Sequence, residues 1–285
     1  MRLLAIPNVS AAEGSGLLRP LTDAMRGVPV SVLDVHSDEI HNRTVFTVAG
    51  EPDEVSTAMV RLAATAARTI DLTRHKGVHP RLGVLDVCPL VPLNDADLPS
   101  AVESATHTGA RIGAEVGIPV YLYGAAARRH ETTALAEMRR GGLEGLIRKR
   151  LPPDYGPEII DRAVGVACVG ARTTLIAFNV WLAADVAEAR RIAGEIRSAG
   201  GGPRGIRALG LSMGRGLSQV SMNLTEPEVT GVDAAYDEVT RRLRTGTVIR
   251  TEIVGLVPER FMPSPDAQAA RLMVPPGRSL ESVLR

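Results

Sequence analysis

Apolar residues in the first part of the chain repeat with two different spacings. Runs of consecutive or alternating apolar residues are typical of strands, whereas apolar residues at every third or fourth position are typical of helices. On this basis the chain begins with the order strand, helix, strand, strand, helix, strand. The predicted strands span residues 2–6, 30–35, 43–48 and 84–90, and the predicted helices span residues 17–28 and 52–66.

The same order of elements returns in the second part of the chain. Strands are predicted at residues 173–182, 206–211, 217–224 and 248–256, and helices at residues 186–196 and 232–243. Gly214 and Gly216 indicate a hairpin turn between the second and third of these strands. Two βαββαβ units predict an α+β protein with two ferredoxin-like subdomains, each with both helices on one face of its sheet. Because the other face also needs cover, we expect the two sheets to pack face to face.

Additional elements lie between and after these units. A helix is predicted at residues 98–116, a strand at residues 119–123 and a charged, glycine-interrupted helical region at residues 128–150. Residues 263–285 contain Pro-Ser-Pro and Pro-Pro-Gly, which are typical of an extended tail. We therefore predict an N-terminal subdomain at residues 1–172, a C-terminal subdomain at residues 173–262, and a tail at residues 263–285.

Composition narrows the classes of function. The sequence has 285 residues, of which 45% are hydrophobic and only 3% aromatic, so its core must be largely aliphatic. The net charge of +1 gives no general attraction to nucleic acid or to an anionic membrane. A ferredoxin-like sheet that binds RNA needs paired aromatic residues on its central strands, and only Phe46 is available. We therefore expect neither nucleic acid nor a membrane as a partner.

The location of the protein is also suggested by its apolar segments. The most apolar stretch, residues 164–182, is broken by Arg172 and Asn179, which favours buried strands over a membrane helix. Cys88 and Cys168 lie in apolar runs without the spacing of a metal site, which favours buried thiols in a reducing compartment. The first residues lack the long apolar segment of a signal peptide. The sequence thus predicts a cytoplasmic protein without a bound metal.

One loop concentrates basic and imidazole groups. Residues 74–83 read Arg-His-Lys-Gly-Val-His-Pro-Arg-Leu-Gly, and Gly77, Pro80 and Gly83 prevent a regular element there. Loops held between rigid elements often carry functional groups. His79 is the candidate general acid and base, and we expect the surrounding cations to hold its pKa near neutrality. The alternative is a solvated basic turn without a catalytic role.

Two further segments have both a functional and a structural interpretation. Asn42 and Arg43 begin a predicted strand and offer donors suited to a substrate carboxylate, but Arg43 could instead pair with Asp34 or Asp38 across a hairpin. The glycine-flanked residues 156–165 could form the lip of a ligand site or a simple connection.

Sequence motifs over nearly the whole chain, up to about Met262, resemble those of the formiminotransferase family. The most specific motif is His79-Pro80-Arg81-Leu82-Gly83 followed by Leu85-Asp86-Val87-Cys88-Pro89. The other motifs are His41 to Thr47, Gly50-Glu51-Pro52, Arg74 to Gly77, Pro119 to Gly124, Val169 to Arg172, Ala177-Phe178-Asn179, Gln219-Val220-Ser221, Asn223-Leu224 and Val254 to Pro258.

The resemblance implies an activity and a set of site residues. It implies transfer of a formimino group from N-formimino-L-glutamate to tetrahydrofolate as co-substrate, without a metal, in a homodimer whose two subdomains hold folate in a tunnel between them. No cyclodeaminase domain is expected after this one. His79 matches the catalytic histidine of the family. The folate-contacting loop of the family matches Gly156, Pro157, Glu158, Ile159, Ile160, Asp161, Arg162, Ala163, Val164 and Gly165. From the chemistry of their side chains we also expect Asn42, Arg43, Lys76 and Arg81 to bind the substrate, with Asp34, His36 and His75 as support for the site.

Two other functions remain open from the sequence. One is a divergent, non-catalytic protein that binds folate or an acidic metabolite. The other is a transferase for a different one-carbon donor.

Overall fold

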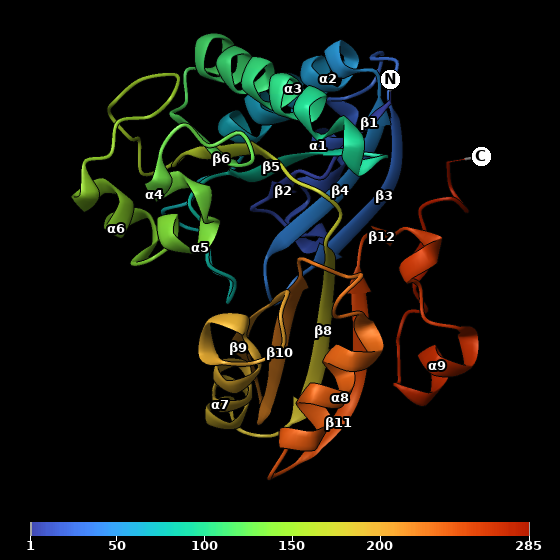
Figure 1. The fold of residues 1–285 in the computed structure, drawn as a ribbon. Helices are drawn as coiled ribbons and strands as arrows, with labels where there is room; N and C mark the ends of the chain where they lie inside the picture. Colours follow the sequence, from blue (N-terminus) through green and yellow to red (C-terminus); the bar gives the residue numbers. More distant parts are fainter. Residues whose placement is uncertain (1, 285) are drawn as a thin grey trace. The chain divides into compact units, whose positions relative to one another are not determined.

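The computed structural model describes residues 2–284. The chain folds as two compact units, Met1–Thr173 and Thr174–Arg285. Each unit contains a sheet and helices that pack on it, so the protein is mixed α+β with two sheet-rich parts. In Figure 1 the first unit runs from blue to green, and the second runs from gold to red.

The first unit is built on a seven-stranded sheet. Its strands are β1 (Leu3–Ala5), β2 (Asn8–Val9), β3 (Ser31–Asp38), β4 (Arg43–Gly50), β5 (Leu85–Pro92), β6 (Val120–Gly124) and β7 (Ala167–Ala171). Both β1 and β2 pair with β4 on one side and β5 on the other, so together they act as one interrupted strand. The sheet is antiparallel from β3 to β5, and β7 and β6 extend it in parallel.

Two long helices cover one face of this sheet. α2 (Pro52–Thr69) and α3 (Leu98–Arg111) lie side by side on it, and α1 (Leu18–Asp23) packs next to α2 (Figure 1). A capping box between Glu51 and Glu54, with proline at the first helical position, begins α2. The buried side chains between helices and strands include Met59, Leu62, Leu85, Leu90 and Leu122. The predicted strands and helices of this part of the chain are therefore organised by one aliphatic core.

A second, smaller core lies on strands β5 to β7, where Tyr121, Tyr123 and Cys168 pack with Met138 and Leu146. These last two residues belong to α5 (Leu135–Met138) and α6 (Gly142–Lys149), which follow α4 (His130–Thr133). The prediction of a glycine-interrupted helical region at residues 128–150 is confirmed at Gly141, and the structure adds a second break at Ala134. The extended backbone of Ala134 and the left-handed backbone of Gly141 break it into three short helices.

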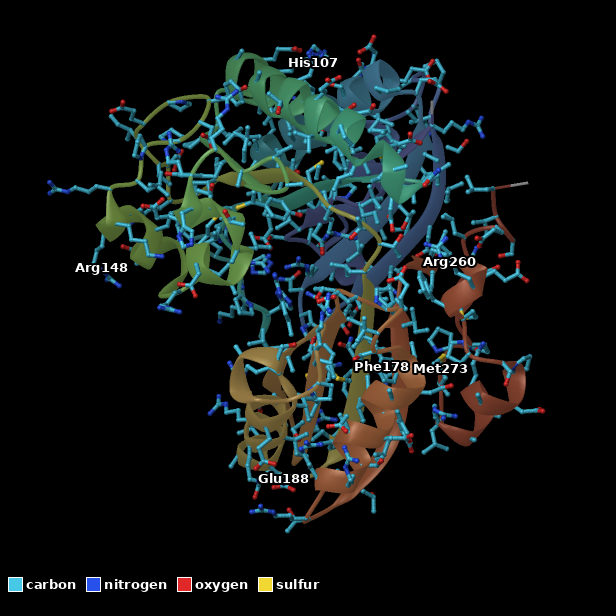
Figure 2. All side chains as sticks on the ribbon, in the orientation of Figure 1. His107, Arg148, Phe178, Glu188, Arg260 and Met273 are labelled. Atoms are coloured by element: carbon cyan, nitrogen blue, oxygen red, sulfur yellow. The ribbon has the colours of Figure 1, made fainter. Side chains whose placement is uncertain are left out.

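The second unit contains an antiparallel sheet in the order β11-β8-β10-β9. Its elements are β8 (Ile176–Ala183), α7 (Val186–Ile196), β9 (Ile206–Gly214), β10 (Leu217–Leu224), α8 (Val232–Arg242) and β11 (Thr247–Val254). Phe178, labelled in Figure 2, is fully buried and packs in one core with Val180 of β8, Ile192 of α7 and Val239 of α8. Both helices therefore cover the same face of this sheet.

The residues after β11 pack on the second unit. β12 (Leu256–Val257) pairs with β13 (Arg278–Ser279), and α9 (Pro265–Ala270) lies between them in sequence. Thr251 of β11 exchanges backbone hydrogen bonds with Leu272 and Val274, and Met273 between them is buried (Figure 2). Much of the predicted tail is thus attached to the edge of this sheet.

Several short turns supplement these elements. They are 3-10 turns at Glu13–Ser15, Asp95–Asp97, Ser198–Gly200 and Glu259–Phe261, and a π-helical turn at Ile112–Val116. Across residues 2–284, we find no helix with both the length and the apolar character that crossing a membrane requires.

Both cysteines are expected to be unreactive in the native protein. Cys88 and Cys168 are free thiols and fully buried, and burial raises the pKa of Cys88 to about 12 and also raises the pKa of Cys168. Titration with Ellman's reagent should therefore detect no thiol until guanidinium chloride is added, and then both. Rapid reaction of either thiol under native conditions would contradict the packing described here.

Candidate active site

The basic loop, residues 74–83, is held by close backbone contacts with two segments of the first unit. A β-carbon on Gly77 would lie 2.3 Å from the carbonyl oxygen of His41. A β-carbon on Gly83 would lie only 1.8 Å from the carbonyl oxygen of Val166. Only glycine permits such approaches, so the sequence of the loop itself fixes its position against the sheet.

This loop is held in place by three residues that were expected to bind substrate or to support the site. The amide of Asn42 donates to the carbonyl of Lys76 at 2.9 Å and accepts the backbone N–H of Ala12 at 3.1 Å. His75 Nε2 lies 2.9 Å from the carbonyl oxygen of Asn42. Arg81 donates to the carbonyl of His75 at 2.9 Å, and the side chain of Lys76 is exposed.

Arg43 connects His79 to three strands of the sheet. Its Nη1 lies 3.0 Å from His79 Nδ1 and donates to Asp86 Oδ2 at 2.8 Å. Its Nε donates to Asn8 Oδ1 at 2.8 Å. The other oxygen of Asp86 accepts the backbone N–H of Leu82 at 2.7 Å. Because Arg43, Asn8 and Asp86 stand on β4, β2 and β5, the sheet itself positions the imidazole.

A second guanidinium reaches the same carboxylate. Arg139 donates to Asp86 Oδ2, the oxygen that already accepts from Arg43. It follows α5 directly, where Met138 is buried in the smaller core. The side chains of Arg43, Arg139 and Asp86 are only 14%, 17% and 1% exposed. Two nearly buried positive charges therefore face one buried negative charge.

These charges shift the pKa values of the cluster. Burial, together with the positive charges of Arg43 and Arg139, holds the pKa of His79 well below 6.5. Burial also lowers the pKa of Arg43 to about 10. Burial opposes ionisation of Asp86, yet Arg139 and Arg43 outweigh it and lower the pKa of this carboxyl. The expected near-neutral pKa of His79 was thus wrong, because the half-buried imidazole loses solvation and lies beside two cations.

The neutral imidazole of His79 can hold its proton on either nitrogen. Nδ1 lies 2.8 Å from the carbonyl oxygen of Pro80, which accepts a proton on Nδ1, and 3.0 Å from the guanidinium of Arg43, which donates to a bare Nδ1. The first tautomer leaves Nε2 free to accept a proton, whereas the second leaves an N–H on Nε2 that can only donate a hydrogen bond. The first tautomer is therefore the one that a general base requires, and the carbonyl of Pro80 stabilises it.

The activity of the free protein is expected to be insensitive to pH around 6.5. A catalytic base with a pKa well below 6.5 stays unprotonated through this range and loses function only as the pH falls further. A pH profile of kcat/KM should therefore be flat on its acid side from pH 8 to about 6.5. An acid limb centred at pH 6.5 or above would contradict the environment assigned to His79.

The remaining residues predicted around His79 lie on the edge strand of the sheet. Asp34 and His36 are on β3, opposite Thr47 and Val45 of β4. Arg43 makes its ion pair with Asp86 of β5, a partner that the hairpin interpretation did not include.

Sequence reasoning missed four residues of the site, which are Asn8, His41, Asp86 and Arg139. The buried ring of His41 lies edge-to-face with that of His79, with 5.7 Å between the ring centres. Asp86 had a detectable signal, because a single carboxylate within an apolar strand must find a charged partner. Arg139 had none, since it is one of several arginines in an irregular helical region.

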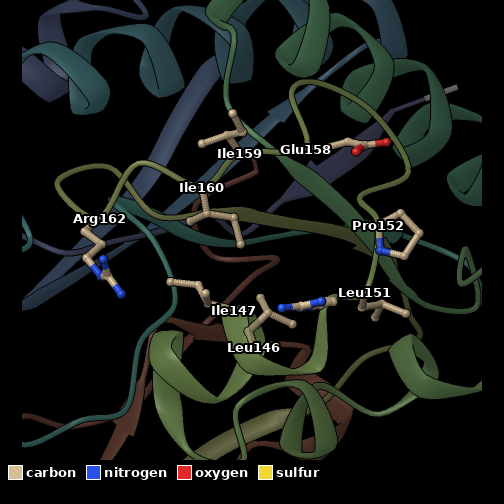
Figure 3. Close-up of a pocket in the computed structure, with 9 residues that line it drawn as sticks. Leu146, Ile147, Leu151, Pro152, Glu158, Ile159, Ile160 and Arg162 are labelled. Carbon is tan, nitrogen blue, oxygen red and sulfur yellow. The ribbon is translucent and has the colours of Figure 1, made fainter.

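The glycine-flanked residues 156–165 approach the basic loop at one end and line a pocket at the other. Gly165 forms an isolated antiparallel bridge with Gly83 of the loop. Figure 3 shows the pocket, about 360 Å³ in volume, between this segment and α6. Its lining residues are Leu146, Ile147, Arg150, Leu151, Pro152, Glu158, Ile159, Ile160 and Arg162. Ile159 is 86% exposed, and Arg162 forms a two-pronged ion pair with Glu144 at 2.8 and 3.0 Å.

Metal ligation has no candidate in the part of the chain that the structure describes. Among residues 2–284, no three His, Cys, Asp or Glu side chains gather as they would around a metal ion.

Comparison with known proteins identifies the family. Residues 2–172 match the N-terminal subdomain of the formiminotransferase domain, and residues 177–270 match the formiminotransferase domain. The chain is 38% identical to the glutamate formimidoyltransferase of Streptococcus pyogenes serotype M1 over 90% of this chain and 89% of that protein. It is 36% identical to the glutamate formimidoyltransferase of Thermoplasma acidophilum over 90% of this chain and 88% of that protein.

Some longer proteins contain a region that is similar to this chain. The chain is 36% identical to the formimidoyltransferase-cyclodeaminase of Sus scrofa over 89% of this chain but spans only 49% of that protein. The matches to both family models and to two proteins of similar length agree with each other. The chain belongs to the formiminotransferase domain family.

Proposed function

We propose that this protein is a glutamate formimidoyltransferase, which transfers the formimino group of N-formimino-L-glutamate to N5 of tetrahydrofolate. Its relatives of similar length carry the name glutamate formimidoyltransferase. The observation that carries the proposal is the half-buried imidazole of His79, with its lowered pKa, held by Arg43 within a member of this family. Tetrahydrofolate is the co-substrate, and no metal takes part in the proposed reaction.

The proposed reaction needs one acid–base group. N5 of tetrahydrofolate forms a bond to the amidine carbon of the donor, and the bond from that carbon to the glutamate nitrogen then breaks. The products are 5-formiminotetrahydrofolate and L-glutamate. His79 accepts the proton that N5 loses and returns a proton to the departing nitrogen. With its own proton on Nδ1, facing the carbonyl of Pro80, His79 takes up the N5 proton at Nε2 and returns it from the same nitrogen.

Binding roles follow from the positions of the other predicted residues. Arg43 is proposed to bind a donor carboxylate while it orients His79, and exposed Lys76 is proposed to attract the acidic substrates. Asn42 and Arg81 are proposed to act by holding the basic loop, since backbone groups occupy donors of both side chains. Residues 156–165 are proposed to contact folate, which the pocket beside them supports.

The same proposal includes predictions about the fold of each subdomain, the ligand tunnel, the oligomeric state and the location of the protein. The strand orders β5-β1/β2-β4-β3 and β11-β8-β10-β9 support two ferredoxin-like subdomains, at residues 1–172 and 173–262. The ligand tunnel, the homodimer and the cytoplasmic location are predictions that rest on the family resemblance.

This function can be tested by measuring both products of the reaction directly. Purified protein is incubated with N-formimino-L-glutamate and tetrahydrofolate, and L-glutamate and the formimino-folate are quantified separately by mass spectrometry. Equal amounts of both, in excess of the enzyme, are the expected result. Folate binding without turnover would favour the non-catalytic function, and turnover with other amidine or formyl donors only would favour a different one-carbon transferase.

A further inference from the structure

We propose that Arg139 binds one carboxylate of the donor and determines that the donor must be acidic. This inference rests on the proposed function and adds to it a residue that neither the sequence pattern nor the family motifs indicated. It is based on the charge balance of the cluster and on the unused donors of this side chain.

The charges of the cluster around Asp86 do not balance. Arg43 and Arg139 bring two positive charges to the single negative charge of Asp86, and all three side chains are at least 83% buried. A region with this excess of buried positive charge is stabilised by an anionic ligand.

The arginine side chains near His79 differ in how many of their N–H donors already have a hydrogen-bond partner. Arg43 uses its Nε and Nη1 for Asn8, Asp86 and His79, which leaves Nη2 for the donor carboxylate proposed above. Arg81 donates to carbonyl groups of its own loop. Arg139 pairs with Asp86 through one nitrogen only, and its buried Nε has no hydrogen-bond partner among residues 2–284. An unsatisfied donor on a buried cation is unfavourable, so a ligand that accepts from this guanidinium is favoured.

Arg139 lies close to His79, the proposed acid–base group. Arg139 and Arg43 donate to the same oxygen of Asp86, and both lower the pKa of His79. A carboxylate bound by Arg139 therefore lies close to the imidazole, as a glutamate substituent on the reacting amidine must. The bound anion would also offset the cations that disfavour protonation of His79.

The test compares three donors that differ only in their carboxylates. They are N-formimino-L-glutamate, N-formimino-L-glutamine, which lacks the γ-carboxylate, and N-formimino-4-aminobutyrate, which lacks the α-carboxylate. We expect Arg139→Met to lower kcat/KM by about 10- to 100-fold for formiminoglutamate and for one of the two analogues. The other analogue, which lacks the carboxylate that Arg139 binds, should be unaffected.

A purely structural role gives a different pattern. If Arg139 only holds Asp86 in place, the variant loses the same factor with all three donors, and this result would overturn the inference. Arg139→Lys keeps the positive charge and should fold even if Arg139→Met does not, with part of the same donor selectivity. Arg140→Met is the control, because Arg140 is 73% exposed and pairs with Glu137.

Calorimetry separates this inference from the proposed function. If the wild-type protein turns over none of the three donors, the proposed function fails, and binding of L-glutamate, L-glutamine and 4-aminobutyrate is measured instead. Selective loss of glutamate affinity in Arg139→Met would still support carboxylate binding by Arg139. Equal affinities for the two proteins, or no binding by the wild type, would refute it.

Discussion

Replacing His79 by alanine is expected to lower kcat by a factor of about 10² to 10⁴ with little change in fold or in KM. The reason is that His79 contributes its chemistry through Nε2, while its contacts to Arg43 and Pro80 involve only Nδ1. The loop that carries it is fixed by other groups, namely Asn42, His75 and Arg81. Steady-state kinetics with both substrates, and circular dichroism of the variant, measure the two parts of this prediction.

A matched histidine variant provides the control. His107 is exposed on α3, on the sheet face opposite the smaller core, so His107→Ala should keep full activity (Figure 2). If His79→Ala retained the activity of the wild type, the acid–base role of the imidazole would have to be abandoned.

The second large effect is expected on stability. Asp86→Asn removes the one negative charge between two nearly buried guanidinium groups and should destabilise the first unit by about 3–5 kcal/mol. The pKa of Asp86 is lowered in the folded protein, so its contribution is complete above the unfolded carboxyl pKa of about 3.9 and is lost as the pH falls through the folded value. At pH 7 the whole effect should therefore be seen.

Urea unfolding followed by two signals measures this effect. Far-ultraviolet circular dichroism reports on both units, whereas Trp181, the single tryptophan of the sequence, lies on β8 of the second unit. Asp86→Asn should move the circular dichroism midpoint to lower urea. Glu144→Gln, which breaks an exposed pair with Arg162, should leave it in place. An unchanged midpoint for Asp86→Asn would show that the Arg43–Asp86–Arg139 cluster does not support the fold.

The elements of the fold were largely predictable because their signals are local. The alternating runs at residues 30–35 and 43–48 correspond to β3 and β4, and the repeat at residues 52–66 corresponds to α2. β7 was not separated from β8 in the sequence, because residues 164–182 form one nearly continuous apolar stretch. Its parallel pairing with β5 and β6 depends on contacts far apart in the chain, which periodicity cannot reveal.

The site was predictable only in part, for a related reason. A motif could assign His79 and its loop, because glycine, proline and histidine at fixed spacing describe a local conformation. The cluster around Asp86 joins residues from β4, β5 and the end of α5, separated by 43 and 53 positions in sequence. Such a cluster leaves no spacing pattern in the sequence. The positive charges around His79, and therefore the direction of its pKa shift, could be recognised only in the structure.

The most direct test of the central claim follows the transferred carbon itself. Donor labelled with ¹³C at the formimino carbon is mixed with tetrahydrofolate and catalytic amounts of wild-type protein or His79→Ala, and carbon NMR spectra are recorded over time. We expect the label to move from the glutamate nitrogen to N5 of folate with the wild type and not to move at a comparable rate with His79→Ala. Label that stays on glutamate with the wild type, or moves equally fast with the variant, would contradict it.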